Sequence, residues 1–127
     1  MKEENGLEEK SLEELAKEVL KGGKSPLYLE LREVEARARD LGFEVFEKTG
    51  SSHKKLIGHR EKVDYSPRQR GKEKVISRGV LEDIEYRTSN ILGVPYQQIR
   101  AFIEGRGKLY KKYKRKFLEE YFKILHE

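Results

Sequence analysis

Residues 43–66 read FEVFEKTGSSHKKLIGHREKVDYS, and this stretch decides the fold. It contains three short segments with apolar or aromatic residues among polar ones, at residues 43–49, 53–59 and 62–66. Gly-Ser-Ser separates the first two segments, and residues 58–61 form a turn between the last two, a pattern that indicates consecutive strands. Because such short connections join antiparallel strands, we expect a three-stranded antiparallel meander.

Helices are expected on both sides of the meander. A capping box at Ser11 and Glu14 starts a short amphipathic helix that ends at Gly22 and Gly23. Further helices are expected from Ser25 and Pro26 to Gly42 and, after a polar basic loop at residues 66–74, from Ser77 to Gly93, from Pro95 to Gly105 and over residues 108–127.

This order predicts an α+β fold. Its centre is a two-layer α-β-β-β-α domain with helices on one sheet face, extended by one N-terminal helix and two C-terminal helices. Residues 1–24 are expected to form an acidic amphipathic helix, residues 25–94 the central nucleic-acid-binding domain, and residues 95–127 a basic helical extension.

The composition is that of a folded domain with a highly charged surface. Of the 127 residues, 40% are charged and 35% hydrophobic, but the apolar ones recur with helical and strand periods. The absence of cysteine excludes disulfides, thiolate metal sites and cysteine nucleophiles. The sequence has neither a signal-peptide pattern nor an apolar run of membrane length, so a cytoplasmic location is expected. Abundant Lys and Glu without cysteine also fit a heat-adapted protein.

Charge is distributed unevenly along the chain. The net charge is +5 at pH 7, although residues 1–21 carry four lysines against seven glutamates. Residues 48–78 hold ten basic against three acidic residues, and residues 105–116 hold seven basic residues and no acidic one. Two basic blocks favour a polyanionic partner, for which we expect RNA before DNA, and no membrane. The alternative is a solvated surface rich in lysine.

His53 is the candidate catalytic residue. RNA carries its own nucleophile, the 2′-hydroxyl, so an RNA-cleaving enzyme needs a base and cations rather than a cofactor. Histidine has an ordinary pKa of about 6.5 and exchanges a proton near neutral pH. Lys54, Lys55 and Arg60 follow closely enough in sequence to bind phosphate. The alternative is that His53 contacts a phosphate or a base without catalysis.

The partner of His53 is left open by the sequence. A single general base accelerates a reaction roughly 10²- to 10⁴-fold, so a fast enzyme needs an acid as well. His59, Tyr65 and Arg60 are the candidates for that acid. The three histidines lack the spacing of zinc ligands, and no glycine-rich phosphate loop occurs, so we expect neither a metal nor another cofactor.

Two further segments are candidate nucleic-acid contacts. The basic loop at residues 66–74 contributes Arg68, Arg70 and Lys72. In the C-terminal RGKLYKKYKRKF, residues 106–117, lysines can follow a phosphate backbone while tyrosines stack on bases; alternatively the tyrosines pack on the domain. The basic candidates in this segment, interleaved with Tyr110 and Tyr113, are Lys111, Lys112, Lys114 and Arg115.

The stretch ARDLGFEVFEKTGSSHKKLI, followed by a basic loop and SRGVLEDIEYRTSNILGV, resembles the HicA family of small RNA-cleaving toxins. The matching features are a helix that ends in Leu-Gly-Phe at residues 41–43, the Gly-Ser-Ser-His turn at residues 50–53, and Gly-x-Leu at residues 79–81. The resemblance covers residues 26–94. It implies a fold like the double-stranded RNA-binding domain, cleavage of messenger RNA by His53, a HicB-type antitoxin as partner, and a loop shaped by Gly50, Ser51 and Ser52.

Three functions are consistent with these features. The first is a HicA-like endoribonuclease that uses His53 without a metal. The second is a non-catalytic protein that binds double-stranded RNA or DNA through its basic C-terminal helix. The third is a protein-interaction module in which the acidic N-terminal helix shields the basic face.

Overall fold

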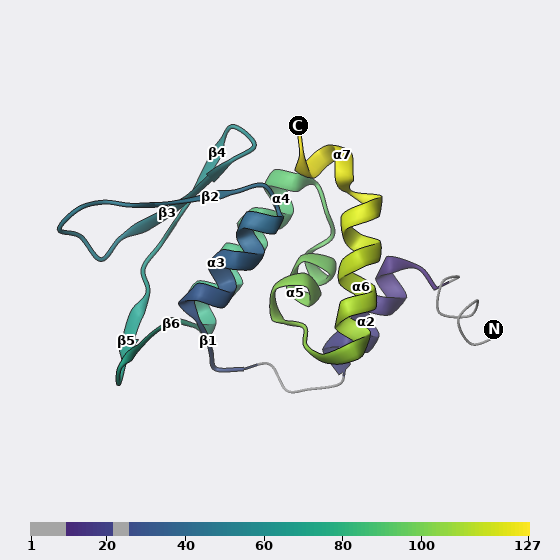
Figure 1. The fold of residues 1–127 in the computed structure, drawn as a ribbon, viewed down its shortest axis with the longest axis horizontal. Coiled ribbons are helices and arrows are strands. Elements are labelled where there is room, and N and C mark those ends of the chain that lie inside the picture. The colour runs from purple at the N-terminus through teal and green to yellow at the C-terminus, as the bar shows by residue number, and fades with distance from the viewer. Residues whose placement is uncertain (1–9, 22–25) are drawn as a thin grey trace.

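The computed structural model describes residues 10–21 and 26–127. Within these residues the chain forms six helices and two three-stranded antiparallel sheets (Figure 1), so the predicted α+β class is confirmed. The helices are α2 (Leu12–Lys21), α3 (Leu31–Asp40), α4 (Arg78–Leu92), α5 (Tyr96–Glu104), α6 (Gly107–Glu120) and α7 (Phe122–Leu125). The strands are β1 (Tyr28–Glu30), β2 (Glu44–Glu47), β3 (Lys54–Gly58), β4 (Glu61–Tyr65), β5 (Arg68–Arg70) and β6 (Glu73–Ser77). The predictions made for Gly22, Gly23 and Ser25 lie outside the described residues.

The predicted meander is confirmed as the sheet β2-β3-β4. Val45 pairs with Leu56, and Leu56 pairs with Val63, so one row of apolar side chains crosses the inner face of the sheet. The turn between β3 and β4 consists of His59 and Arg60, whose φ angles are 53° and 64°. Positive φ at both central residues is the conformation of a type I′ turn, whose twist matches that of the two strands.

The helix expected from Pro26 begins only at Leu31, so the first turn of that prediction is wrong. Residues Tyr28–Glu30 form β1 instead, which pairs antiparallel with β6. Leu29 lies opposite Ile76, and both side chains are buried. Local periodicity cannot reveal a strand of three residues whose partner lies far along the chain.

The loop expected at residues 66–74 is largely a hairpin, which corrects a second prediction. β5 and β6 pair antiparallel with Arg70 opposite Glu73, and Gly71 turns the chain with a φ of 60°. Together with β1 they form the second sheet, in the order β1-β6-β5. The polar composition suggested a loop because all three residues of this edge strand are exposed to solvent.

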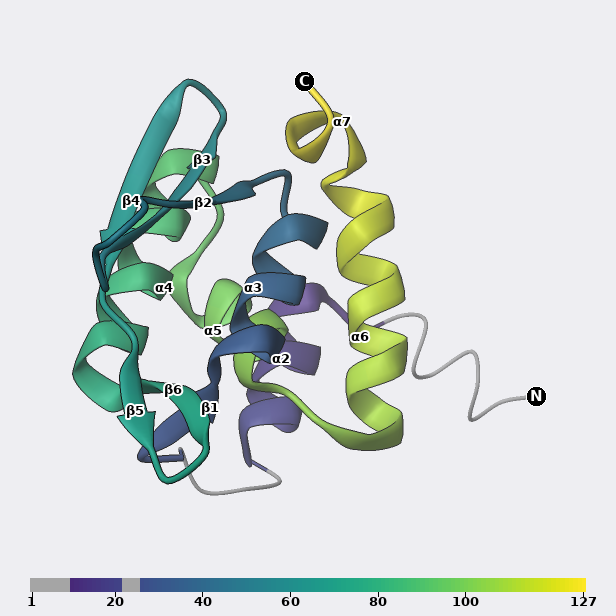
Figure 2. The same ribbon diagram turned by 60° about the vertical axis from the view of Figure 1, so that its left-hand side comes forward.

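One hydrophobic core joins the elements of the three predicted segments. α3 contacts β2, and α4 contacts β4, so both helices lie against the inner face of the meander (Figure 2). α5 contacts α2, α3, α4 and α6 behind them. The core therefore includes Leu15 of α2, Val63 of β4 and Phe117 of α6. No helix within residues 10–21 and 26–127 has the length and apolar character needed to cross a membrane.

Candidate nucleic-acid site

His53 lies immediately before β3, exposed to solvent, and its ring is held from one side. Lys54 pairs with Tyr65 at the end of the β3–β4 ladder, which brings His53 opposite Ser66. The Nδ1 atom of His53 lies 2.8 Å from the hydroxyl oxygen of Ser66. The backbone N–H of His53 donates to Oγ of Ser51 at 3.1 Å. The loop before β3 therefore fixes the main chain, and the loop after β4 fixes the ring.

The chemistry of His53 depends on the nitrogen that carries the proton. When Nδ1 carries it, the N–H donates to Oγ of Ser66 and Nε2 keeps a free lone pair. Nε2 has no hydrogen-bond partner among the residues that the structure describes. A ring that is oriented through one nitrogen and open at the other has the arrangement of a general base.

The Gly-Ser-Ser loop before His53 is compact and reaches the surface. Gly50 has a φ of 78°, a left-handed conformation that glycine adopts without steric cost. The backbone N–H of Ser51 donates to the carbonyl of Lys48 at 3.1 Å, which closes the turn. Ser52 is exposed beside it. The predicted loop residues are thus adjacent to His53 and open to a ligand.

The side chain of Lys54 points into the core, whereas that of Lys55 is exposed to solvent. Its Nζ lies 2.7 Å from Oε2 of Glu35, and the two residues are only 8% and 7% exposed. The hydroxyl of Tyr65 donates to the same oxygen at 2.5 Å, and burial together with this hydrogen bond raises the pKa of Tyr65. Lys54 therefore neutralises a buried carboxylate between β3 and α3, whereas Lys55 is exposed on the opposite face.

None of the three candidate acids lies beside His53. Tyr65 is committed to Glu35 in the core. His59 and Arg60 form the turn at the other end of β3, roughly 20 Å away at about 3.3 Å per strand residue. Nε2 of His59 lies 2.8 Å from the carbonyl oxygen of Leu41, and its ring meets Phe43 edge-on. His59 thus tethers the hairpin to the end of α3.

Arg60 is separated from the other predicted phosphate ligands. It lines a hollow of about 530 Å³ together with Ile124 of α7 and Glu127 at the C-terminal end of the chain. This hollow lies at the opposite end of β3 from His53. Of the predicted phosphate ligands, two are exposed and near His53 or its partner Ser66 in the sequence: Lys55 is two positions after His53, and Arg68 is two positions after Ser66.

The β5–β6 hairpin continues the basic surface from Ser66. Arg68, Arg70 and Lys72 are all exposed, and β5 follows β4 with only two residues between them. The guanidinium of Arg70 lies 4.0 Å from the centre of the Tyr28 ring, a cation–π contact that orients it. We call His53, Lys55, Ser66 and Arg68 the His53 cluster. Arg70 and Lys72 of the hairpin extend its basic surface.

The basic helix α6 forms a separate group. Lys111, Lys112 and Arg115 are exposed, while Lys114 lies 2.9 Å from a carboxylate oxygen of Asp40. In both views α6 lies on the side of the molecule away from the meander (Figures 1 and 2). Apart from the buried Lys54 and from Arg60 at the far hairpin turn, the predicted nucleic-acid contacts therefore divide into two separate surfaces, one beside His53 and on the β5–β6 hairpin and one on α6.

The tyrosines of α6 pack on the domain. Tyr110 donates to the carbonyl of Phe102 at 2.7 Å, and Tyr113 donates to the carbonyl of Gln98 at 2.6 Å. Burial raises the pKa of Tyr110 to about 12 and also raises that of Tyr113. The packing interpretation of these side chains is confirmed, and the stacking alternative is wrong, because their ring faces are enclosed by the core.

A buried charged cluster between α4 and α5 was not anticipated from the sequence. Arg78 donates through two nitrogens to Glu104, at 3.1 and 2.5 Å, and one of them lies 3.4 Å from Glu85. Burial, followed by a hydrogen bond to Glu104, raises the pKa of Glu85 to about 10. Burial acts in the same sense on Glu104, but hydrogen bonds from Arg78 and Glu85 outweigh it and lower the pKa of Glu104. Glu85 is 0% exposed, so it cannot contact a ligand at the surface, and the cluster links Arg78 at the start of α4 to Glu104 at the end of α5.

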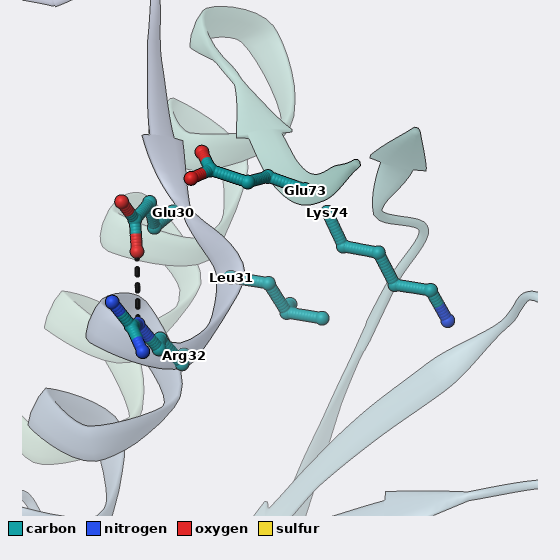
Figure 3. A pocket seen from close by; sticks show the side chains of 5 residues that line it. All are labelled: Glu30, Leu31, Arg32, Glu73 and Lys74. Carbon is teal, nitrogen blue, oxygen red and sulfur yellow. Dashed lines mark hydrogen bonds and ion pairs between the residues drawn. The ribbon is translucent and has the colours of Figure 1, made fainter. Parts of the chain in front are cut away.

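A hollow of about 280 Å³ lies beside the start of α3 and carries balanced charges (Figure 3). Arg32 donates to Glu30 at 2.9 Å on one side of it. Two acidic and two basic side chains line it, so it has little net attraction for phosphate; the lining residues are Glu30, Leu31, Arg32, Glu73 and Lys74. Among the described residues no three His, Asp or Glu side chains gather in a way that holds a metal ion.

Comparison with known proteins assigns no family to the chain. No protein-family model matches it, and neither a curated protein nor a solved structure is significantly similar to it. The His53 cluster and the basic face of α6 are therefore the two features that indicate a function.

Proposed function

We propose that this protein binds RNA and cleaves it without a metal, with His53 as the general base. The observation that carries the proposal is the exposed ring of His53, held through Nδ1 by the hydroxyl of Ser66 at 2.8 Å. Lys55, two residues after His53, and Arg68, two residues after Ser66, are exposed basic residues that can supply positive charge to the substrate.

The reaction is an internal transfer at phosphorus. Nε2 of His53 removes the proton of a 2′-hydroxyl, and the resulting oxygen attacks the adjacent phosphorus. The new P–O2′ bond forms as the P–O5′ bond breaks, which leaves a cyclic phosphate and a 5′-hydroxyl, whose proton comes from solvent. Lys55 and Arg68 stabilise the charge that develops on the phosphate oxygens. With one positioned proton-transfer group, the expected acceleration by that group is roughly 10²- to 10⁴-fold.

The order of elements supports the proposal. α3, the meander β2-β3-β4 and α4 follow one another in the α-β-β-β-α order that the resemblance to HicA toxins implies, with the β5–β6 hairpin inserted before α4. We therefore include in the proposal an arrangement like the double-stranded RNA-binding domain and control by a HicB-type antitoxin. The turn that presents His53 is Gly-Ser-Ser-His, as in that resemblance.

A second candidate function rests on α6. Lys111, Lys112 and Arg115 are exposed on the face opposite the buried tyrosines, which is the distribution of a helix that lies along a phosphate backbone. This face would bind double-stranded RNA or DNA without cleaving it. Because α6 lies away from the meander, the two functions depend on different residues and can be separated by mutation.

The test follows a long labelled RNA incubated with the protein in EDTA, with cleavage and retention on a native gel measured in parallel. We expect His53→Ala to abolish cleavage and to retain binding, and Ser66→Ala to lower the rate and shift its pH profile. The matched control is the triple variant Lys111→Gln, Lys112→Gln, Arg115→Gln, which removes charge from α6 only. Cleavage by His53→Ala at the wild-type rate would contradict the proposal, and loss of all binding in the triple variant would favour the second candidate.

A further inference from the structure

The outer face of the meander carries an exposed aromatic side chain beside the His53 cluster. Phe46 is 48% exposed and Ile57 is 37% exposed, although both lie in regular strands. Alternation along β3 puts Lys55 and Ile57 on this outer face, and His53 continues the same row. The inner face, in contrast, holds the buried row that contains Leu56 and Val63.

The strand register locates Phe46 relative to His53. Phe46 pairs with Lys55, and Glu44 pairs with Ile57. His53 and Ile57 lie two residues before and after Lys55, so both are diagonal neighbours of Phe46. Diagonal neighbours across two antiparallel strands have Cα atoms roughly 7–8 Å apart, within reach of an aromatic ring. A single nucleotide can therefore contact Phe46 with its base and His53 with its sugar.

The charges around Phe46 balance, and positive charge is in excess on the adjoining β5–β6 hairpin. Lys55 is directly opposite it, and Lys62 lies opposite Ile57 on β4. Two carboxylates share the face, because Asp64 lies opposite Lys55 and Glu44 opposite Ile57. The meander is thus near neutral, and the excess of positive charge comes from the adjoining β5–β6 hairpin. Phosphates are expected over the hairpin and bases over the meander.

We propose that Phe46 stacks on a base of single-stranded RNA and so orients the nucleotide whose 2′-hydroxyl His53 deprotonates. This inference rests on the proposed function and names its substrate class. A base in a duplex is stacked on its neighbours and offers no free face, whereas a base in a single strand can stack on an exposed aromatic ring. Ile57 extends the apolar surface on which the next base lies.

A protein partner is the alternative occupant of this face. Two partly exposed apolar side chains form a patch far smaller than the roughly 1,200 Å² that a stable interface buries. Phe46 and Ile57 are also bordered by charges of both signs rather than by further apolar residues. The small apolar area and the neighbouring His53 favour a nucleotide over a second copy of the chain.

The absence of tryptophan from the sequence makes a direct test possible. Phe46→Trp introduces the only indole, and base stacking quenches its fluorescence. The control is Tyr86→Trp, because Tyr86 is 60% exposed on α4, the helix that packs on the inner face of the sheet. Both variants are combined with His53→Ala so that the RNA stays intact, and each is titrated with a uridine 12-mer and with a 12-base-pair RNA duplex. Gel retention is measured on the same samples.

We expect the 12-mer to quench the fluorescence of the Phe46→Trp variant and to leave that of the Tyr86→Trp variant unchanged, and the duplex to quench neither. Binding of the 12-mer to the Phe46→Trp variant without quenching would overturn the stacking inference while leaving the proposed function in place. Stronger quenching by the duplex would overturn the assignment to single strands. Failure of the wild type to cleave any RNA, with quenching of the Phe46→Trp variant retained, would overturn the proposed catalysis alone.

The affinity for the 12-mer of variants without an introduced tryptophan gives an independent measurement. We expect Phe46→Ala to weaken binding of the 12-mer roughly 5- to 150-fold, the range of one base–aromatic stack, and Phe46→Tyr to restore it. The oligomeric state of the wild type and of both variants is measured by size-exclusion chromatography with light scattering. An oligomer in the wild type that Phe46→Ala converts to a monomer would overturn the inference in favour of a self-association surface.

Discussion

The meander and helix α6 both interleave aromatic residues with lysines, yet they use them in opposite ways. On α6 the rings of Tyr110, Tyr113 and Phe117 are buried, and Lys111 and Lys112 face solvent. On the meander Phe46 is half exposed, and Lys54 is one of the buried residues. The same composition therefore gives a packed helix in one region and an open aromatic surface in the other.

The difference follows from what lies over each element. α6 packs on α5 and α2, where the ring of Phe117 lies 4.6 Å from that of Phe102 and 4.8 Å from that of Tyr121. The meander has α3 and α4 against one face, and its other face holds the exposed Phe46 and Ile57. Because no element that the structure describes covers this face, Phe46 remains available to a ligand.

The two regions also bury charge in different ways. In the meander Lys54 neutralises Glu35, so a pair of opposite charges is enclosed. Between α4 and α5 two carboxyl groups, Glu85 and Glu104, share Arg78. When both are charged, Oε2 of Glu85 has no hydrogen-bond donor among the described residues, whereas a proton on Glu85 lets it donate to Glu104. The meander thus encloses one carboxylate with one cation, whereas two carboxyl groups share one arginine between α4 and α5, where burial raises the pKa of Glu85.

The largest expected effect tests the contrast between the two aromatic groups. Phe117→Ala empties a fully buried site and is expected to lower the free energy of unfolding by about 3–5 kcal/mol. Phe46→Ala removes a half-exposed ring and is expected to lower it by less than about 1 kcal/mol. Urea denaturation followed by circular dichroism measures both. Equal losses in the two variants would show that the meander needs Phe46 for stability rather than for binding.

The next effect separates the two adjacent lysines of β3. Lys54→Met leaves the buried Glu35 without its counter-charge and is expected to lower the free energy of unfolding by about 3 kcal/mol. Lys55→Met, on the exposed face, should leave stability nearly unchanged and weaken RNA binding. The double variant Lys54→Met, Glu35→Leu is expected to recover most of the loss, because no buried charge is left unpaired. If it recovers none, packing of the lysine stem rather than charge explains the single variant.

The last effect, smallest when it is taken per pH unit, is the pH dependence that comes from Glu85. Its raised pKa means that the folded protein holds a proton that the unfolded chain releases above pH 4.5, so stability falls as the pH rises toward 10. Glu85→Gln removes this fall, which is at most about 1.4 kcal/mol per pH unit. Thermal unfolding of both proteins between pH 5 and pH 9 is the measurement.

The control for this prediction is Glu82→Gln, one turn before Glu85 on α4. The Glu82 side chain is 57% exposed and lies 3.3 Å from Arg78, so the substitution removes a carboxylate from the same arginine without changing the buried pair. It should leave the slope of stability against pH unaltered. If stability falls with pH equally steeply in the wild type and in Glu85→Gln, then Glu85 is charged in the folded protein.

The sequence alone determined the elements that depend on local signals. The meander, the end of α4 at Gly93 and the spacing of the α6 aromatics could all be predicted, because turn residues and periodicity act over a few positions. His53 could be singled out from its turn and its basic neighbours. Ser66 carried no such signal, since its role depends on the strand register that brings it opposite His53.

Tertiary structure decided what each of these residues faces. β1 and β6 were missed because each needs the other, and the inward turn of Lys54 depends on Glu35, which α3 contributes. The separation of the two basic surfaces likewise follows from the packing of α5 between α3 and α6. Local sequence sets which conformations are available to a segment, but only the contacts among distant segments decide which side chains are buried and which are left to bind.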